Sequence, residues 1–249
     1  MPNSWKEALF GYRYPFDLSE FVDSRNHPGW FTFRSDSGDR AGTMEFEAHF
    51  RSHAAEFMEP WLEVIFWKIY SQPRGRADRY TRRAAKFLSE NSISAKSLWE
   101  ACNYYIEEPT KTNFNALRQL LGLSSQSIAL AATFPSFARP DLFPMIDTRI
   151  AKWVGKFMSL HNAVDLFGPQ LIRPKYVDSK QTVLGMNDFE FMQAWVRWCR
   201  HQAQKLTAHT PPVWRARDVE MAVFHTWGGR GTHPRSTLNP LGSLPSNGH

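Results

Sequence analysis

The sequence contains only two cysteines, Cys102 and Cys199, and no second cysteine lies near either one. This spacing excludes a disulfide framework and a thiolate-bound zinc or iron–sulfur cluster, and both thiols are expected to be buried in the core. The nine histidines lack the His-x-Glu and His-Glu-x-x-His spacings of zinc enzymes. We therefore expect no metal site and no cofactor.

Long apolar runs are also missing. No stretch approaches the roughly 20 apolar residues that a membrane-spanning helix requires. Residues 1–14 lack the apolar centre of a signal peptide. We therefore expect a soluble, cytoplasmic protein with no membrane partner, and a chain of 249 residues is long enough to bury a core of its own.

The charge balance is basic. The sequence has 30 Lys and Arg residues against 24 Asp and Glu residues, which gives a net charge of +6 and modestly favours a polyanionic partner. Aromatic residues make up 14% of the chain and include ten tryptophans. Such rings can stack on nucleic-acid bases, but a ring taken singly is more often part of the core.

From about Glu45 onward, apolar residues recur three, four and seven positions apart, which is the spacing of one face of an α-helix. The four clearest stripes span Leu62 to Ile69, Leu98 to Tyr105, Ile150 to Phe157, and Met192 to Cys199. Shorter helices are predicted at 79–90, 113–121, 125–134 and 216–226. The sequence therefore predicts a mainly α protein, with one helical domain over residues 45–227.

Three stretches lack this pattern. Residues 1–44 are predicted as an irregular or β-like extended segment, because most of the stretch mixes Gly, Pro and Asp with short aromatic pieces. Residues 168–188 carry two prolines and a glycine and are predicted as a long loop or β-like flap. Residues 228–249 are Gly-, Pro- and Ser-rich and are predicted to be a disordered tail.

A hairpin of two short helices is predicted over residues 117–129. The first helix would end at Gly122 and the second would start near Ser125. A helix N-terminus leaves backbone N–H groups without intrahelical partners, and such groups bind anions. We therefore expect Gly122, Ser124, Ser125 and Ser127 to contact a phosphate.

A single carboxylate follows this hairpin at a predicted helix start. Pro144 and the apolar pair Met145 and Ile146 predict an extended approach, and Asp147 then occupies the N-cap of an amphipathic helix. The positive end of the helix dipole favours a negative charge at that place. Taken alone, an N-cap aspartate usually has only a structural role. The spacing of Asp147 from the hairpin is what favours a functional role.

In this order of parts, the chain resembles the helix-hairpin-helix DNA glycosylase superfamily, which includes endonuclease III and the 8-oxoguanine and alkyladenine glycosylases. The family pattern Leu-Pro-Gly-Val-Gly-x-Lys-x-Ala, followed after about twenty residues by Val-Asp-Thr-His-Val or Ile, is matched by residues 120–129 and by 146–150. Residues 64–72 resemble the family's first core helix. Leu121 and Ser124 depart from the pattern, because they replace its proline and its second glycine.

The resemblance implies a helical glycosylase that flips a modified base out of duplex DNA, with Asp147 as the catalytic carboxylate. Gln126 occupies the position at which bifunctional members carry a lysine nucleophile. The resemblance therefore implies a monofunctional enzyme that hydrolyses the N-glycosidic bond with water and leaves an abasic site. Base-excision repair and defence against phage DNA with hypermodified bases are both open as roles. The alternatives are a non-catalytic helix-hairpin-helix DNA-binding protein and a helical interaction protein.

Further contacts follow from the same resemblance. Two interpretations of Gln72 are open: it enters the duplex, as the resemblance implies, or it is a polar residue at a helix end before Pro73. Arg74 and Arg76 begin a basic run that either extends this contact to phosphates or is only a solvated helix face, and Arg149 is a further candidate phosphate contact. The enzyme is expected to be a monomer. Candidates for the base pocket are the following seven residues, most of which we expect to be core: Trp30, Trp67, Tyr70, Trp195, Trp198, His225 and Trp227. Asp218 is a second candidate carboxylate, although its place at a predicted helix start indicates a structural cap.

Overall fold

The computed structural model describes residues 2–14, 38–70, 76–161, 169–178, 183–209 and 213–226. Within those ranges the protein is mainly helical, as predicted, and contains no strand. Its α-helices are α1 (Pro2–Phe10), α3 (Arg40–His53), α4 (Glu59–Ile69), α5 (Arg76–Glu90), α6 (Ala95–Glu107), α7 (Lys111–Leu120), α8 (Ile128–Ala131), α9 (Thr133–Ala138), α10 (Thr148–His161), α11 (Phe189–His209) and α12 (Ala216–Thr226). Two 3-10 helices, η1 (Lys175–Asp178) and η2 (Met186–Asp188), precede α11.

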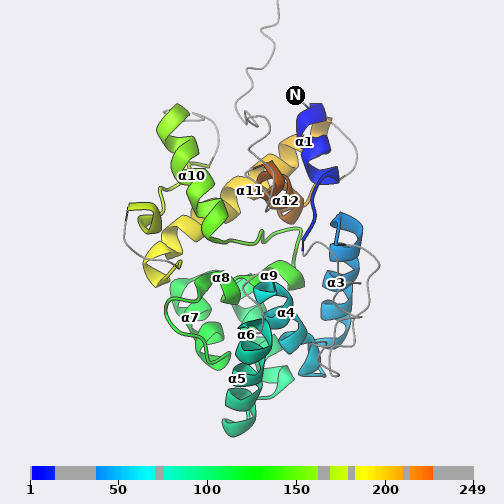
Figure 1. Cartoon of the computed structure of the whole chain (residues 1–249), viewed down its shortest axis with the longest axis vertical. Helices are drawn as coiled ribbons and strands as arrows, with labels where there is room; N and C mark the ends of the chain where they lie inside the picture. The colour runs from blue at the N-terminus through cyan, green and yellow to red at the C-terminus, as the bar shows by residue number, and fades with distance from the viewer. Residues whose placement is uncertain are drawn as a thin grey trace, which may run out of the picture.

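The helices enclose two hydrophobic cores, which lie in the upper and lower halves of Figure 1. The upper core is built mainly by α1, α10, α11 and α12 around Trp195 and Val219. The lower core is built mainly by α3 to α9 around Trp61 and Phe134. Each of the four apolar stripes in the sequence lies in a helix of one of these cores, which confirms the helical prediction.

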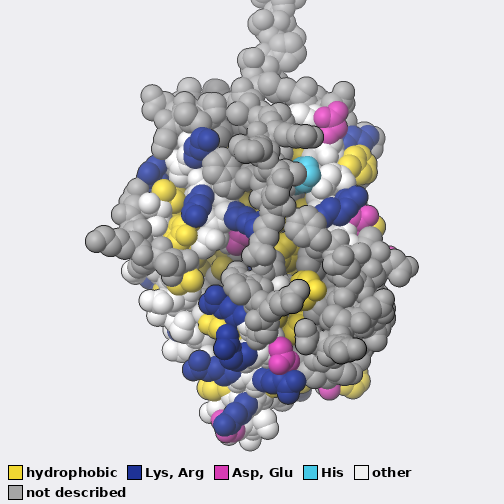
Figure 2. All heavy atoms as spheres, viewed as in Figure 1, with side chains coloured by type: hydrophobic (Ala, Val, Ile, Leu, Met, Phe, Trp, Pro, Cys, Tyr) yellow, Lys and Arg dark blue, Asp and Glu magenta, His cyan; other side chains and the backbone are white. Residues whose placement is uncertain are grey.

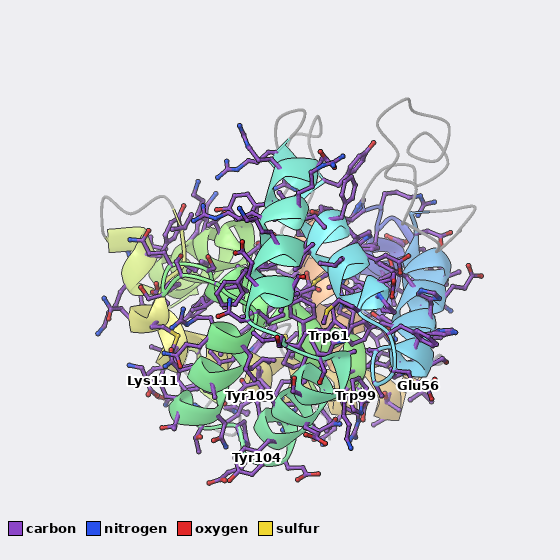
Figure 3. All side chains as sticks on the ribbon, turned by 90° about the horizontal axis from the view of Figure 1, so that it is seen from below. Glu56, Trp61, Trp99, Tyr104, Tyr105 and Lys111 are labelled. Carbon is purple, nitrogen blue, oxygen red and sulfur yellow. The ribbon has the colours of Figure 1, made fainter. Side chains whose placement is uncertain are left out.

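The lower core is rich in aromatic contacts. Trp61 is fully buried, lies 4.9 Å from Phe134 between ring centroids, and donates its indole N–H to Ala54 O at 2.8 Å. Tyr104 and Tyr105 are adjacent in α6 but differ in exposure. Tyr105 lies among packed side chains, whereas Tyr104 is 58% exposed at the edge of the molecule (Figure 3). The tryptophans here are packing residues.

The structure corrects the prediction of an extended segment over residues 1–44. Residues 2–10 form α1, and α3 begins at Arg40 behind its N-cap Asp39, whose carboxylate accepts from Gly42 N at 3.0 Å. Trp5, Ala8 and Leu9 are buried at helical spacing, and α1 packs against α12. This apolar pattern is too short to predict a helix from the sequence, and the apolar face is recognised only because α12 covers it. Residues 15–37, the middle of this predicted segment, lie outside the described residues.

The predicted flap contains 3-10 turns rather than β-structure in its described parts, 169–178 and 183–188. The side chain of Asp188 accepts from Tyr176 N at 3.0 Å and from Gly185 N at 3.4 Å. A carboxylate therefore satisfies backbone groups that a neighbouring strand would otherwise bind. The tail predicted to be disordered, residues 228–249, lies outside the described residues.

The helix predicted over 125–134 is divided into α8 and α9. Pro135, at the third position of α9, has no N–H to donate to the preceding turn, and its ring restricts the backbone there. Ser136 of α9 then donates to Ala132 O and to Pro144 O at 2.9 and 2.8 Å. The break turns the chain toward the segment that leads to α10.

A cluster of buried charges, here called the ionic cluster, joins α3 of the lower core to α12 of the upper core. Its members are three carboxylates and three arginines: Glu47, Asp218, Glu220, Arg40, Arg215 and Arg217. Arg40 donates from two nitrogens to the carboxylate of Asp218 at 3.0 and 2.9 Å. Arg215 reaches Glu47 at 2.5 Å and Asp218 at 2.8 Å. The formal charges cancel, which is the condition under which buried ions are tolerated.

The two central acids of the ionic cluster are shifted in opposite directions. Burial raises the pKa of Glu47 above its ordinary value, although Arg215 and Arg217 oppose the shift. Burial would also raise the pKa of Asp218, but hydrogen bonds from Arg215 and Arg40 outweigh it and lower the pKa. Asp218 also accepts from Arg215 N at 3.1 Å. The expectation that Asp218 is a structural cap agrees with these contacts.

We predict that Arg40→Met destabilises the fold by about 1–3 kcal/mol, because it removes a bidentate partner from a buried carboxylate. Urea unfolding followed by circular dichroism measures the loss. The control is Arg82→Met, which breaks an exposed i, i+4 pair with Asp78 and should cause no measurable change. Equal losses in the two variants would contradict a structural role for the ionic cluster.

Candidate active site

The segment between α9 and α10 carries Asp147 and crosses between the two cores. Met145 is buried in the lower core and the next residue, Ile146, in the upper core. The indole of Trp195 donates to Met145 O at 2.9 Å, and Ser136 Oγ donates to Pro144 O at 2.8 Å. Side chains from both sides thus hold the extended backbone in place, and Asp147 emerges half-buried where the cores meet.

Asp147 caps α10, as the sequence predicted. Its Oδ1 accepts from the backbone N–H groups of Arg149 and Ile150, each at 2.8 Å. No other described residue donates a hydrogen bond to this carboxylate, so Oδ2 is available to a bound molecule. The capping bonds fix the orientation of the group, and the helix dipole stabilises its negative charge.

A lysine that the sequence pattern did not indicate interacts electrostatically with this carboxylate. Lys68, in the last turn of α4, places its Nζ 3.5 Å from Met145 Sδ. Burial lowers the pKa of Lys68 to about 8; the carboxylate of Asp147 opposes that shift, and Arg217 and Arg149 add to it. A signal was present in the sequence, because Lys68 is a single charge after the apolar run 64–67.

Aromatic and cationic side chains surround this pair. Tyr14 donates its hydroxyl to Lys68 O at 2.9 Å and packs edge-on against Trp67 and Phe224, at 4.9 and 5.6 Å between centroids. The guanidinium of Arg149 lies 5.0 Å above the centre of the Phe224 ring. The surroundings of Asp147 therefore combine one free carboxylate oxygen, two cations and several ring edges.

The predicted hairpin is formed by α7, a tight turn and α8. Gly122, at φ +66°, ends α7 in the left-handed conformation, and Gly122 N and Leu123 N donate back to Gln119 O and Arg118 O at 2.9 and 3.1 Å. The second helix begins at Ile128, three residues later than expected. Ser124 replaces the expected glycine and joins its hydroxyl to that of Ser127 at 3.1 Å.

The tip of the hairpin is exposed and is anchored to the flap. Ser124, Ser125 and Gln126 are all exposed. Ser125 O accepts from Met186 N at 2.9 Å, which ties the turn to η2. No described residue hydrogen-bonds the amide of Gln126, so the position at which the resemblance expects a lysine presents a free neutral side chain.

The candidates for a base pocket have separate locations. Trp67, Trp195 and Trp198 are buried in the cores, and the last two stack on each other at 5.2 Å between centroids. Tyr70 is half-buried against Phe66. His225 is half-buried against Gly11, and burial together with the charge of Arg13 lowers its pKa. Packing is thus the role the structure shows for the three tryptophans. Trp30 and Trp227 lie outside the described residues, as do Gln72 and Arg74.

Basic side chains gather over α5 and α10 on the face shown in Figure 2. On α5, Arg76, Arg79 and Arg83 are exposed, and on α10, Lys152 and Lys156 are exposed. Arg79 and Arg83 have no acidic partner among the described residues. Two groups of exposed cations therefore flank the region in which the two cores meet.

Comparison with known proteins adds no family to this description: neither the family models, nor the curated proteins, nor the solved structures yield a match to the chain. Among the described residues, no helix is both long and apolar enough to cross a membrane. No group of three or more His, Cys, Asp or Glu side chains in those residues is placed to hold a metal ion.

We predict that Gly122→Ala destabilises the protein by about 1–3 kcal/mol, because a side chain strains the left-handed backbone there. The new Cβ would also lie 2.4 Å from the Phe87 ring. Thermal and urea unfolding measure the effect. Gly185→Ala is the control, since its φ is −118° and its nearest new contact is 3.4 Å, and it should cost less. An unchanged unfolding midpoint for Gly122→Ala would argue against this turn.

Proposed function

We propose that the chain is a monofunctional DNA N-glycosylase, which flips a modified base out of duplex DNA and hydrolyses its N-glycosidic bond. The observation that carries the proposal is Asp147: one oxygen is fixed by the cap of α10, and the other is left free where the two cores meet. The order of hairpin, short connection and capping aspartate resembles that of the helix-hairpin-helix glycosylases.

The proposed mechanism follows from the charges at this place. The target base must first leave the stack, which costs a few kcal/mol and favours weakly paired or altered bases. As the bond from C1′ to the base nitrogen lengthens, positive charge develops on the sugar. The fixed carboxylate of Asp147 stabilises that charge without having to reorganise, and Oδ2 orients the attacking water. Gln126 provides no amine, so water is the nucleophile.

The DNA contacts of the proposal come from three places. The exposed hairpin turn presents backbone N–H groups and the hydroxyls of Ser124, Ser125 and Ser127 to a phosphate. The cations of α5 and α10 extend the contact on either side (Figure 2). Repair of damaged chromosomal DNA and attack on hypermodified phage DNA in the cytoplasm would use the same contacts, and only the base released separates them.

We predict that Asp147→Asn lowers base release by on the order of 10²-fold or more while duplex affinity is retained, because asparagine keeps the cap but not the charge. The measurement is mass analysis of bases released from duplexes with alkylated, oxidised, mismatched or glucosylated bases. Unchanged unfolding of Asp147→Asn is the control for folding.

The altered hairpin, with Leu121 and Ser124 in place of the expected residues and only four residues in α8, also favours a second candidate, a non-catalytic DNA-binding protein. The same assay separates the two functions. Duplex binding without release of any base, before and after the substitution, would support the binding protein and reject the glycosylase.

We predict that the double variant Arg79→Gln, Arg83→Gln reduces the slope of log affinity against log salt by about 2, since each phosphate contact contributes roughly 0.9. Fluorescence anisotropy with a labelled duplex between low and physiological salt measures the slope. The control is Lys96→Gln, Lys111→Gln, in which Lys111 lies at the end of α7 opposite the hairpin. Equal slopes in the two double variants would exclude α5 from the interface.

A further inference from the structure

Lys68 lies beside Asp147, and the mechanism described above does not use it. Its ammonium has three N–H donors, and among the described residues its hydrogen-bond partner is the thioether of Met145, at 3.5 Å. A thioether is a weak acceptor. An ammonium at the meeting of two cores with so little protein bonding has donors available for an acceptor on a bound molecule.

The position of this amine is well determined. Lys68 belongs to the last turn of α4, the neighbouring Trp67 is buried in the lower core, and Lys68 O accepts from Tyr14. The charged groups that act on the amine are Asp147, Arg149 and Arg217. With a pKa of about 8, Lys68 is mostly protonated at neutral pH and yet gives up a proton more readily than an exposed lysine.

We propose that Lys68 is a catalytic residue that donates a proton to the leaving base. The inference rests on the proposed glycosylase function and assigns the residue that protonates the leaving base. Asp147 faces the sugar, on which positive charge develops, and Lys68 faces the base, on which negative charge develops. The proposal gives a role to a cation with free donors that interacts electrostatically with the Asp147 carboxylate.

The step balances as a simple hydrolysis. The bond from C1′ to the base nitrogen breaks, and its electron pair stays with the base. A proton passes from Lys68 Nζ to the base, which leaves neutral. Water adds to C1′ and loses one proton by way of Asp147 to solvent, and Lys68 is reprotonated from solvent. No oxidant, metal or other reactant is needed.

The inference makes the contribution of Lys68 depend on the leaving group. A neutral base, such as hypoxanthine, uracil or 8-oxoguanine, would leave as an anion unless it receives a proton. A base with a formal positive charge, such as 7-methylguanine, leaves neutral without one. Proton donation by a positioned side chain contributes about 10²–10⁴-fold to a rate, so Lys68 should matter at that level for neutral bases only.

The experiment measures single-turnover base release from duplexes with one neutral or one cationic modified base, between pH 6 and 9.5. The proteins are wild type, Lys68→Met, Lys68→Arg and the matched control Lys96→Met, which changes an exposed lysine of α6. Methionine removes a poorly solvated cation, so the unfolding midpoint of Lys68→Met should not fall. Arginine keeps the charge but holds its proton too firmly to transfer it.

For neutral bases, we expect the wild-type rate to fall as the pH rises through about 8, because the protonated form of Lys68 is the active one. Both Lys68 variants should lose on the order of 10²-fold or more and show no such decline, whereas Lys96→Met should match wild type. For the cationic base, all four proteins should release at similar rates.

Other outcomes overturn the inference. Equal losses on neutral and cationic bases, or a wild-type enzyme that acts on cationic bases alone, would show that no proton is supplied. A loss of duplex affinity with a smaller salt slope in Lys68→Met would assign the amine to a phosphate. Borohydride trapping of a covalent adduct through Lys68 would make it a nucleophile. Release of no base by wild type would instead reject the glycosylase proposal itself.

Discussion

The ionic cluster between α3 and α12 holds the two cores together, and the candidate active site depends on that connection. Arg40 and Arg215 both bind the carboxylate of Asp218, and Arg215 also binds Glu47. The helices of each core therefore contribute charges of both signs. Burying six ions is costly, and hydrophobic residues of similar volume could bind as strongly. What the charges add is geometry, because bidentate guanidinium contacts accept few relative positions of the two helices.

The segment from Pro144 to Asp147 places the candidate site where the two cores meet. Since Met145 and Ile146 are buried in opposite cores, a shift of one core against the other would pull the backbone away from one of its packed side chains. The bonds from Trp195 and Ser136 add to this restraint. Asp147 is therefore oriented twice, by the approach of the chain and by the cap of α10, which is the preorganisation that charge stabilisation requires.

Asp147 and Lys68 show how one environment acts on two opposite charges. The carboxylate raises the proton affinity of the amine, whereas burial and the two nearby arginines lower it, and the net result is an amine that can exchange its proton near neutral pH. The carboxylate is held by backbone N–H groups and not by a side-chain ion pair with Lys68. Among the described residues, the Lys68 ammonium bonds only the Met145 thioether and Oδ2 of Asp147 accepts no hydrogen bond, so both groups keep free hydrogen-bonding capacity.

The sequence by itself determined the features that depend on neighbours along the chain. Apolar spacing located the helices, Asp147 was identified as the cap of α10, and Gly122 was identified as the end of α7, because caps and turns involve residues only a few positions apart. The helix at Pro2–Phe10 was missed because its short apolar face is covered only in the tertiary structure. The division of 125–134 into α8 and α9 was missed although Pro135, a local feature, restricts the backbone there.

Only the tertiary structure decided which distant side chains meet. Arg40 and Asp218 are 178 positions apart, and the hydroxyl of Tyr14 reaches Lys68 O across 54 positions. No local pattern encodes such pairs. The same holds for the burial of Trp195 and Trp198 and for the place of Lys68 beside Asp147, because burial and charge environment depend on what folds over a residue, whereas periodicity reports only which face of its own helix it occupies.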